Sequence, residues 1–227
     1  MATAYFMEAV TRMTDAASDQ EHIRMLIDSR PATPDRTAYI LGKSEANPLP
    51  VMAETGRSLA AAGARVIAVP CNTAQYFQEE LEESIGVHVI NMVRETVHYL
   101  KERGYGRVGV MGTDGTIESG IYQKEIEAAG MEAVVPDAEH QAMDTYLIYD
   151  CVKANRPINT EMFLAIGRHL RENGAEAIIL GCTELSVIKQ QYDIGPGYLD
   201  AMDVLARVAL EACGAPVKPE FDTLITE

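Results

Sequence analysis

The chain has 227 residues, of which 34 are acidic and 19 basic, so its formal net charge is −15. Hydrophobic residues make up 47% and charged residues 23%, proportions that are usual for a globular protein with a buried core. The acidic balance argues against a polyanionic partner, whether nucleic acid or a membrane surface. An anionic small molecule would need arginine or lysine side chains placed at its own binding site.

The sequence carries no sign of membrane insertion or of a disulfide framework. No apolar run approaches the ~20 residues that span a bilayer, and residues 1–10 lack the basic and apolar segments of a secretory signal. We therefore expect a cytoplasmic protein without a membrane partner. Four cysteines in a chain of this length, none in a CxxC pair, leave burial or thiol chemistry as their roles.

Helices and strands are expected to alternate along the first half. Apolar residues at helical spacing predict helices, and short unbroken apolar runs predict buried strands. The expected elements are a helix over 3–17, a strand over 23–27, a proline-containing loop over 30–37, a helix over 50–62, a strand over 65–69, a helix reaching residue 83 and a strand over 87–90.

The second half repeats this order. The expected elements are a helix over 94–103, a strand over 107–111, a glycine-containing turn over 112–116, a helix over 118–129, a strand over 132–135, helices over 138–154 and 159–173, a strand over 177–180 and a last helix over 202–213. Apolar strands that alternate with helices favour mainly parallel sheets covered on both faces. We therefore predict an α/β fold with two similar three-layer α/β/α halves.

Two segments, 61–73 and 172–184, resemble each other. Both run from a helix end through Gly-Ala and an apolar strand to a proline or glycine, a cysteine and then polar residues. The two cysteines, Cys71 and Cys182, are 182 − 71 = 111 residues apart, about half the chain. This echo predicts a duplicated unit, with halves related by pseudo-two-fold symmetry and one cysteine at the same place in each.

Each of these cysteines follows a strand and precedes an expected helix. Ligands of parallel α/β sheets bind beyond the carboxyl ends of the strands, and a helix N-terminus favours the thiolate. Two thiols on opposite sides of one cleft suit the inversion of a stereocentre, because one removes a proton while the other supplies one. A single cysteine at a strand end is more often a small buried hydrophobe. The matched pair, with polar followers, favours catalysis, whereas Cys151 and Cys213 are expected to pack within helices.

Four motifs carry a resemblance to a known family. Pro-Cys-Asn-Thr-Ala (70–74) and Gly-Cys-Thr-Glu-Leu (181–185) resemble the paired signatures of the aspartate/glutamate racemase superfamily, and residues 34–42 and 112–122 resemble its aspartate racemase branch. The resemblance implies an isomerase that interconverts L- and D-aspartate by two-base proton transfer, without pyridoxal phosphate or another cofactor. It further implies a homodimer, with one domain formed by 1–93 and 203–227 and a second by 94–202.

The resemblance also assigns site residues beside the catalytic pair Cys71 and Cys182. Arg36 and Lys153 would bind the substrate carboxylates, for which bidentate arginine is well suited. The remaining positions expected to line the site are Asn72, Thr73, Thr116, Tyr149 and Thr183. The plainer alternatives are surface charges for Arg36 and Lys153, and a turn or N-cap residue for Thr116. The five histidines form no evident metal-ligand cluster, so no metal is expected.

One departure from the family pattern leaves the function open. Family members usually begin with a strand and a glycine-rich turn, whereas this sequence begins at about the first helix, so we expect the first strand to be missing. The alternatives are a glutamate or hydantoin racemase, an enzyme like maleate isomerase whose thiol attacks a double bond, or a non-catalytic relative that binds a small molecule. A substrate panel separates the enzymes, and binding without turnover identifies the last.

Overall fold

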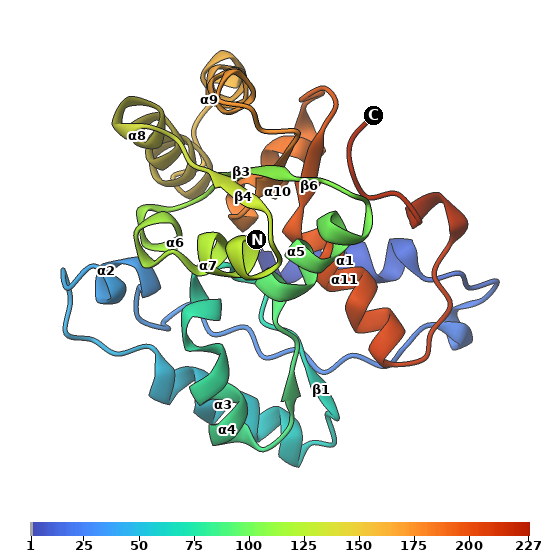
Figure 1. Cartoon of the computed structure of the whole chain (residues 1–227). Helices are drawn as coiled ribbons and strands as arrows, with labels where there is room; N and C mark the ends of the chain where they lie inside the picture. Colours follow the sequence, from blue (N-terminus) through green and yellow to red (C-terminus); the bar gives the residue numbers. More distant parts are fainter. Residues whose placement is uncertain (1) are drawn as a thin grey trace.

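Two parallel sheets organise the fold, and the computed structural model describes residues 2–227 of it (Figure 1). The larger sheet has the strand order β4-β3-β5-β6 and the smaller one the order β1-β2. All four neighbouring strand pairs are parallel, which confirms the predicted α/β class. The strands are β1 (Val66–Ile67), β2 (His88–Val89), β3 (Arg107–Met111), β4 (Glu132–Val134), β5 (Ala177–Leu180) and β6 (Tyr198–Asp200).

Helices connect the strands throughout residues 2–227. The α-helices are α1 (Ala2–Met13), α2 (Arg36–Ile40), α3 (Leu49–Ala61), α4 (Gln78–Ile85), α5 (Met92–Glu102), α6 (Asp114–Ser119), α7 (Ile121–Ala128), α8 (Ala138–Tyr146), α9 (Thr160–Glu172), α10 (Thr183–Gln191) and α11 (Ala201–Ala212). Shorter helical segments are η1 (Asp19–Glu21), η2 (Thr73–Phe77), the π-helical η3 (Leu147–Lys153) and η4 (Pro219–Phe221). None of the helices in the described residues is long and apolar enough to cross a membrane.

The larger sheet is covered on both faces, and β5 illustrates how its sequence does this. Ala177 and Ile179 contribute to a core shared with α1, α5 and α11, whereas Ile178 and Leu180 contribute to a core on the opposite face with η3 and α9. Side chains alternate across a strand, so an unbroken apolar run serves two cores. Burying each of the large side chains contributes about 1.5–3 kcal/mol. Figure 1 shows α8 and α9 on one side of this sheet and α1, α5 and α11 on the other.

The smaller sheet has a much smaller core. It lies with α3 and α4 at the bottom of Figure 1, and its cluster of fully buried residues contains Ala53, Ile67, Leu81 and Val89. The largest cluster of the molecule draws on α1, α5, β3 and α11, which come from both predicted domains. The division into 1–93 with 203–227 and 94–202 therefore stays a prediction.

Several expected elements differ in the structure. The segment expected as a strand over 23–27 is in no hydrogen-bonded strand pair, and β1 is shorter than the apolar run over 65–69. A strand exists only where a neighbour accepts its hydrogen bonds, so local composition overestimates both. The turn expected over 112–116 already contains the start of α6, because Thr113 caps that helix through the amide of Thr116. The expected helix over 138–154 is α8 followed by η3, and β6 was not predicted.

Candidate active site

The two predicted cysteines, Cys71 and Cys182, line one small pocket of about 110 Å³ between the ends of β1, β3 and β5. A second cavity of about 200 Å³ adjoins it and shares Lys153, Thr183 and Glu184. The pocket is thus at the carboxyl edge of both sheets, where ligands of parallel sheets bind. Its predicted lining residues are Arg36, Cys71, Asn72, Thr73, Tyr149, Lys153, Cys182 and Thr183, and it also contains Ala2, Asp35, Thr37, Pro70, Thr113 and Glu184.

Cys71 lies beside a positive charge. Asp35 caps α2 by accepting a hydrogen bond from the amide of Ala38, which orients Arg36 at the start of that helix. One guanidinium nitrogen of Arg36 donates to the carbonyl of Pro34 at 3.1 Å, and the other lies 3.8 Å from the Cys71 sulfur. The negative charge of a Cys71 thiolate is the largest cause that raises the pKa of Arg36. The arrangement therefore places a positive charge beside the Cys71 sulfur.

Cys182 has the opposite surroundings. It is the N-cap residue of α10, is only 6% exposed and donates its thiol hydrogen to the Glu184 carboxylate, with a sulfur–oxygen distance of 3.0 Å. Burial raises the pKa of Cys182 well above the usual value, and the charge of Glu184 raises it further. Cys182 is therefore held as a neutral thiol. The pocket thus combines a sulfur that lies beside a guanidinium group with a buried sulfur that keeps its proton.

Lys153 brings a second cation to the rim of the pocket. Its ammonium nitrogen lies 3.9 Å from the ring centroid of Tyr149, and both residues belong to η3. Burial alone would lower the pKa of Lys153, but the nearby charge of Glu184 raises it above its usual value. Lys153 is therefore a stable cation at neutral pH. With Arg36 it places two positive charges at one pocket in a strongly acidic protein.

Asn72 presents an unused hydrogen-bond donor. Its side-chain oxygen accepts a hydrogen bond from the hydroxyl of Tyr122 at 2.5 Å, and both residues are buried. The amide nitrogen of Asn72 has no partner within residues 2–227. A buried donor without a partner costs about 1–3 kcal/mol, which a bound anion would recover. Tyr122 therefore fixes which end of the Asn72 amide is free to meet a ligand.

We expect Tyr122→Phe to weaken substrate binding more than it slows the reaction. Loss of the hydroxyl frees the Asn72 amide to rotate, which forfeits about 1–2 kcal/mol of an oriented hydrogen bond and raises KM about 5- to 30-fold. Steady-state kinetics give KM and kcat separately. Tyr99→Phe is the matched control, because it removes a buried tyrosine hydroxyl that accepts a hydrogen bond from the amide of Leu224 and does not line the pocket. Equal effects of both variants on KM would contradict the positioning role.

Thr116 differs from its predicted position. It is fully buried and is not among the residues that line the pocket. Its hydroxyl lies 3.0 Å from that of Thr73 and 3.1 Å from that of Thr113, and the Thr37 hydroxyl donates to Thr113 at 3.2 Å. The four hydroxyls join α2 and η2 to the loop after β3. Thr116 supports the pocket wall from behind, and Thr113 is the N-cap residue.

Asp144 supports the same loop from α8. It is fully buried, and one of its carboxylate oxygens accepts a hydrogen bond from the amide of Gly112 at 2.7 Å. Its other oxygen has no partner among the described residues. Burial raises the pKa of Asp144 to about 8, against the lowering effect of the Gly112 amide. A neutral carboxyl group therefore holds the glycine that precedes Thr113.

Sequence reasoning did not assign roles to several of the pocket residues. Glu184 was predicted only as a polar residue that follows Cys182. Two residues apart at the start of a helix, the two side chains can meet, and in the structure the Cys182 thiol does donate to the Glu184 carboxylate. Asp35 and Thr37 flank the predicted Arg36, so their presence follows once that helix is placed at the pocket. The place of Thr113 could be found only from the structure, because its contacts with Thr37 and Thr73 join residues that are far apart in the sequence.

Two of the five histidines lie together with a carboxylate, although no such cluster was predicted. Asp137, His140 and His169 each offer a ligand atom, and these atoms lie within 4.8 Å of one another. The expectation that the histidines form no metal-ligand cluster is therefore wrong for this trio. The two rings are stacked, with centroids 3.9 Å apart and planes 17° from parallel. A metal lies in the plane of each imidazole that binds it, so the rings would first have to turn.

Comparison with known proteins defines the family. Residues 1–209 match the family model described as Asp/Glu/Hydantoin racemase. The chain belongs to this racemase family. Among curated relatives, it is 30% identical over 150 residues to the broad specificity amino-acid racemase RacX of Bacillus subtilis, covering 64% of this chain and 63% of that one. It is 31% identical over 165 residues to a glutamate racemase of Thermus thermophilus, covering 67% and 58%.

Solved structures support the same fold over nearly the whole chain. The aspartate racemase of Picrophilus torridus is similar, with a TM-score of 0.81 and 28% identity over 97% of this chain and 93% of that one. An aspartate racemase homologue from Pyrococcus horikoshii has a TM-score of 0.75 and 22% identity over 94% of each chain, which supports the fold alone. The chain spans less than two thirds of the length of the Bacillus and Thermus relatives.

Proposed function

We propose that this protein racemises an acidic amino acid, aspartate above all, with Cys71 and Cys182 as the two acid–base groups. The observation that carries the proposal is the pairing of both sulfurs with two cations in a single pocket. Arg36 and Lys153 supply the positive charge that a dicarboxylate needs against a net charge of −15. Homodimer formation, independence of pyridoxal phosphate and a cytoplasmic location stay predictions.

The proposed step moves one proton on each side of the α-carbon. The Cys71 thiolate takes the α-proton, so the C–H bond breaks, an S–H bond forms and the electron pair passes into the carboxylate as an enolate-like dianion. The Cys182 thiol then gives its proton to the opposite face, which leaves Cys71 as thiol and Cys182 as thiolate. That state is set for the reverse direction. Arg36, Lys153 and the free Asn72 amide would stabilise the added negative charge.

In the proposed mechanism, Cys71 begins as the thiolate and Cys182 as the thiol. Arg36 is 3.8 Å from the Cys71 sulfur, whereas the Cys182 thiol donates to Glu184. A thiolate at Cys182 would face the Glu184 carboxylate and would therefore be the less stable of the two charged states. The enantiomer whose α-hydrogen faces Cys71 would therefore meet the thiols already in the protonation state that its reaction needs. The other enantiomer would first need a proton to pass between the two thiols.

The preference for aspartate rests on size and on similarity. A pocket of about 110 Å³ suits a short side chain, and one additional methylene changes kcat/KM about 10- to 200-fold in a fitted apolar site. The structure of the Picrophilus aspartate racemase is similar over nearly the whole chain. Glutamate and broad substrate ranges are the alternatives, because curated relatives with those names also match.

Chiral chromatography of single-enantiomer substrates tests this function. The purified chain is incubated without cofactor with L-aspartate, D-aspartate, L-glutamate and L-alanine, and the opposite enantiomer is measured over time. We expect racemisation of both aspartate enantiomers, slower conversion of glutamate and none of alanine, which lacks the second carboxylate. Equal rates for alanine and aspartate would contradict the assignment of the second cation. Thermal stabilisation by aspartate without turnover would support a binding protein instead.

A further inference from the structure

A buried network of polar side chains lies behind α10, the helix that begins at the proposed active site. Its centre is Asp200, which ends β6 and is fully buried. One oxygen of Asp200 accepts hydrogen bonds from the Ser186 hydroxyl at 2.8 Å and from the amide of Met202 at 2.9 Å. Its other oxygen lies 3.3 Å from the Tyr5 hydroxyl and 3.8 Å from the Lys189 ammonium nitrogen. A single carboxylate thus joins α1, α10 and α11.

Lys189 supplies the inner cation of this network. It pairs with Asp200 and with Asp203 of α11, and its side chain is only 18% exposed. Burial raises the pKa of Asp200, and the charge of Lys189 is the largest cause that opposes this rise. Arg12 of α1, a helix that lies beside α11 (Figure 1), reaches Asp203 at 3.4 Å. Two carboxylates are therefore balanced by two cations in a largely buried position.

The backbone just before Cys182 is fixed by the larger sheet. The amide of Gly181 donates to the carbonyl of Met111 at 2.8 Å. A Cβ atom at Gly181 would lie 2.7 Å from that same oxygen and 3.1 Å from the ring of Tyr122, so the chain is closely packed at this point. The freedom that remains to Cys182 is therefore the tilt and rotation of the helix that follows it.

Two kinds of contact hold that helix. The buried apolar side chains of α10 belong to the core that it shares with η3 and α9, and apolar packing is not directional. Hydrogen bonds have preferred lengths and angles. Ser186 and Lys189 follow Cys182 by four and seven positions, a spacing that places them on one face of the helix. Both reach Asp200, so the polar contacts are the ones that fix how α10 is turned.

Stability alone gives a weak reason for this network. Replacing a buried ion pair by apolar residues of similar volume is often neutral or stabilising. Asp200 offers geometry instead, because it lies in strand register with Leu180, two residues before Cys182. The network therefore ties the first turns of α10 to the strand that leads into the catalytic position.

We propose that Asp200, acting through Ser186 and Lys189, is the positioning residue that sets where the Cys182 thiol lies in the pocket. The inference rests on the proposed function, in which Cys182 must reach one face of the α-carbon. A misplacement of about 1 Å costs about 10²-fold in rate, and a small turn of α10 would move the thiol at its first residue by such an amount.

Ser186→Ala tests this assignment, because it removes one contact of Asp200 and leaves the buried charges paired. Thr14→Val is the matched control. It removes a hydroxyl that is equally buried, donates to the carbonyl of Val10 at the end of α1 and lies outside the pocket lining. Lys189→Met is a second variant that removes the other contact of α10 with Asp200.

Two readouts separate positioning from a general loss of stability. For racemisation of aspartate, we expect kcat to fall about 10- to 100-fold in Ser186→Ala with KM nearly unchanged, whereas Thr14→Val should keep both values. The second readout is the rate at which iodoacetamide alkylates Cys182 relative to Cys71 in the substrate-free protein, measured by peptide mass spectrometry. We expect this ratio to rise severalfold in Ser186→Ala and in Lys189→Met, because a loosened α10 exposes the buried thiol.

Equal kcat values and equal alkylation ratios in Ser186→Ala and Thr14→Val would overturn the proposal. A fall in kcat that tracks the loss of Tm equally in both variants would also overturn it, because the network would then serve stability alone. Alkylation needs no turnover, so the two proposals can fail separately. A changed ratio in a chain that does not racemise would reject the racemase and leave the placement of Cys182 by Asp200 standing. Racemisation with both readouts unchanged in Ser186→Ala would reject the positioning role alone.

Discussion

Replacing either Cys71 or Cys182 by alanine is expected to abolish racemisation in both directions. Each turnover needs a base on one face of the α-carbon and an acid on the other, so neither thiol can serve alone. Acid–base groups of this kind contribute about 10²- to 10⁴-fold to rate, and we expect kcat to fall by about 10³-fold or more in each variant. Chiral chromatography in both directions measures the loss.

Cys213→Ala is the matched control for this result. Cys213 is exposed, follows α11 and is outside the pocket lining, so the variant should racemise at the unchanged rate. A full rate in either Cys71→Ala or Cys182→Ala would mean that the reaction does not use the two-thiol pair. Circular dichroism of each variant confirms that lost activity does not reflect lost folding.

Asp144→Asn is expected to stabilise the protein at high pH. Burial raises the pKa of Asp144 in the folded chain to about 8, against an ordinary value of 3.8. Between these values the unfolded chain binds fewer protons than the folded one, so this group's contribution to stability is present at low pH and falls as pH rises toward 8. The asparagine side chain is neutral throughout and retains an oxygen for the Gly112 amide. The stability advantage of the variant over the natural chain should therefore grow by up to about 4 kcal/mol between pH 5 and pH 8.

Urea unfolding of both chains at pH 5 and pH 8.5 measures this difference. The free energy of unfolding of the variant, relative to that of the natural chain, should be higher at pH 8.5 than at pH 5. Comparing the two chains at each pH removes the contribution of groups that they share, including Asp200, whose pKa burial also raises. A constant difference between the chains at both pH values would contradict a neutral Asp144.

The sequence was sufficient to predict the strands that have neighbours on both sides. The apolar runs of β3 and β5 appear in the structure at the predicted bounds of 107–111 and 177–180, because burial on two faces leaves little choice of residue. The run at 23–27 is also mostly apolar and yet is unpaired, since pairing depends on a neighbour that local sequence does not contain. Residue type therefore predicted which segments can be strands and not which segments pair.

The candidate site was likewise only partly predictable from the sequence. Motif residues such as Arg36 and Lys153, on separate elements, do line one pocket, although their roles remain proposals. Thr116 was placed in the lining from its motif, but the start of α6 turns it toward Thr73 behind the wall. The contact of Asp144 with Gly112 joins residues 32 positions apart, and no local pattern marks it. Contacts that cross between elements are the part that required the structure.

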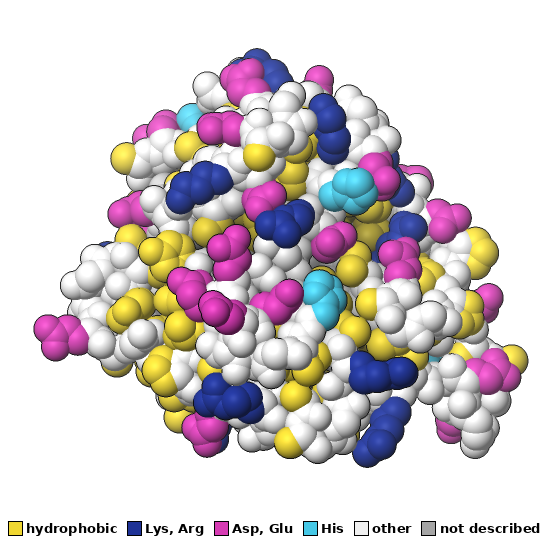
Figure 2. Space-filling model, turned by 60° about the horizontal axis from the view of Figure 1, so that its bottom comes forward, with side chains coloured by type: hydrophobic (Ala, Val, Ile, Leu, Met, Phe, Trp, Pro, Cys, Tyr) yellow, Lys and Arg dark blue, Asp and Glu magenta, His cyan; other side chains and the backbone are white. Residues whose placement is uncertain are grey.

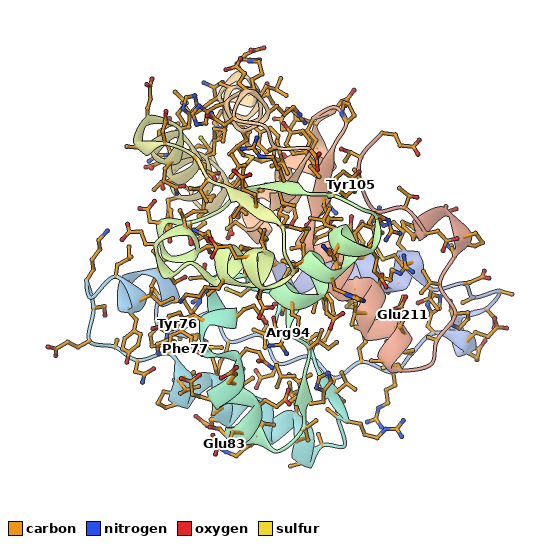
Figure 3. The ribbon with its side chains drawn as sticks, in the orientation of Figure 1. Tyr76, Phe77, Glu83, Arg94, Tyr105 and Glu211 are labelled. Atoms are coloured by element: carbon orange, nitrogen blue, oxygen red, sulfur yellow. The ribbon has the colours of Figure 1, made fainter. Side chains whose placement is uncertain are left out.

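The acidic surface explains why an anionic substrate would need cations within the pocket itself. Figure 2 shows acidic side chains gathered on the face that it presents, and a shallow groove of about 610 Å³ is lined by Glu79, Glu82, Glu83 and Glu95 together with Arg94. Figure 3 labels Glu83 and Arg94 on this side, and Tyr76 and Phe77 beside it. A field of this sign repels an anionic substrate at long range. In the proposed function, binding depends on Arg36 and Lys153 at short range, and we expect it to strengthen with moderate salt until those contacts are screened.

The central claim is that the protein removes and replaces the α-proton of aspartate. The most direct measurement follows the Cα–H signal of L-aspartate by proton NMR in D2O with the purified chain and no added cofactor. The account predicts that this signal disappears as deuterium enters, and that it persists with Cys71→Ala and with Cys182→Ala. A signal that persists with the natural chain, or that disappears equally fast with both variants, would contradict it.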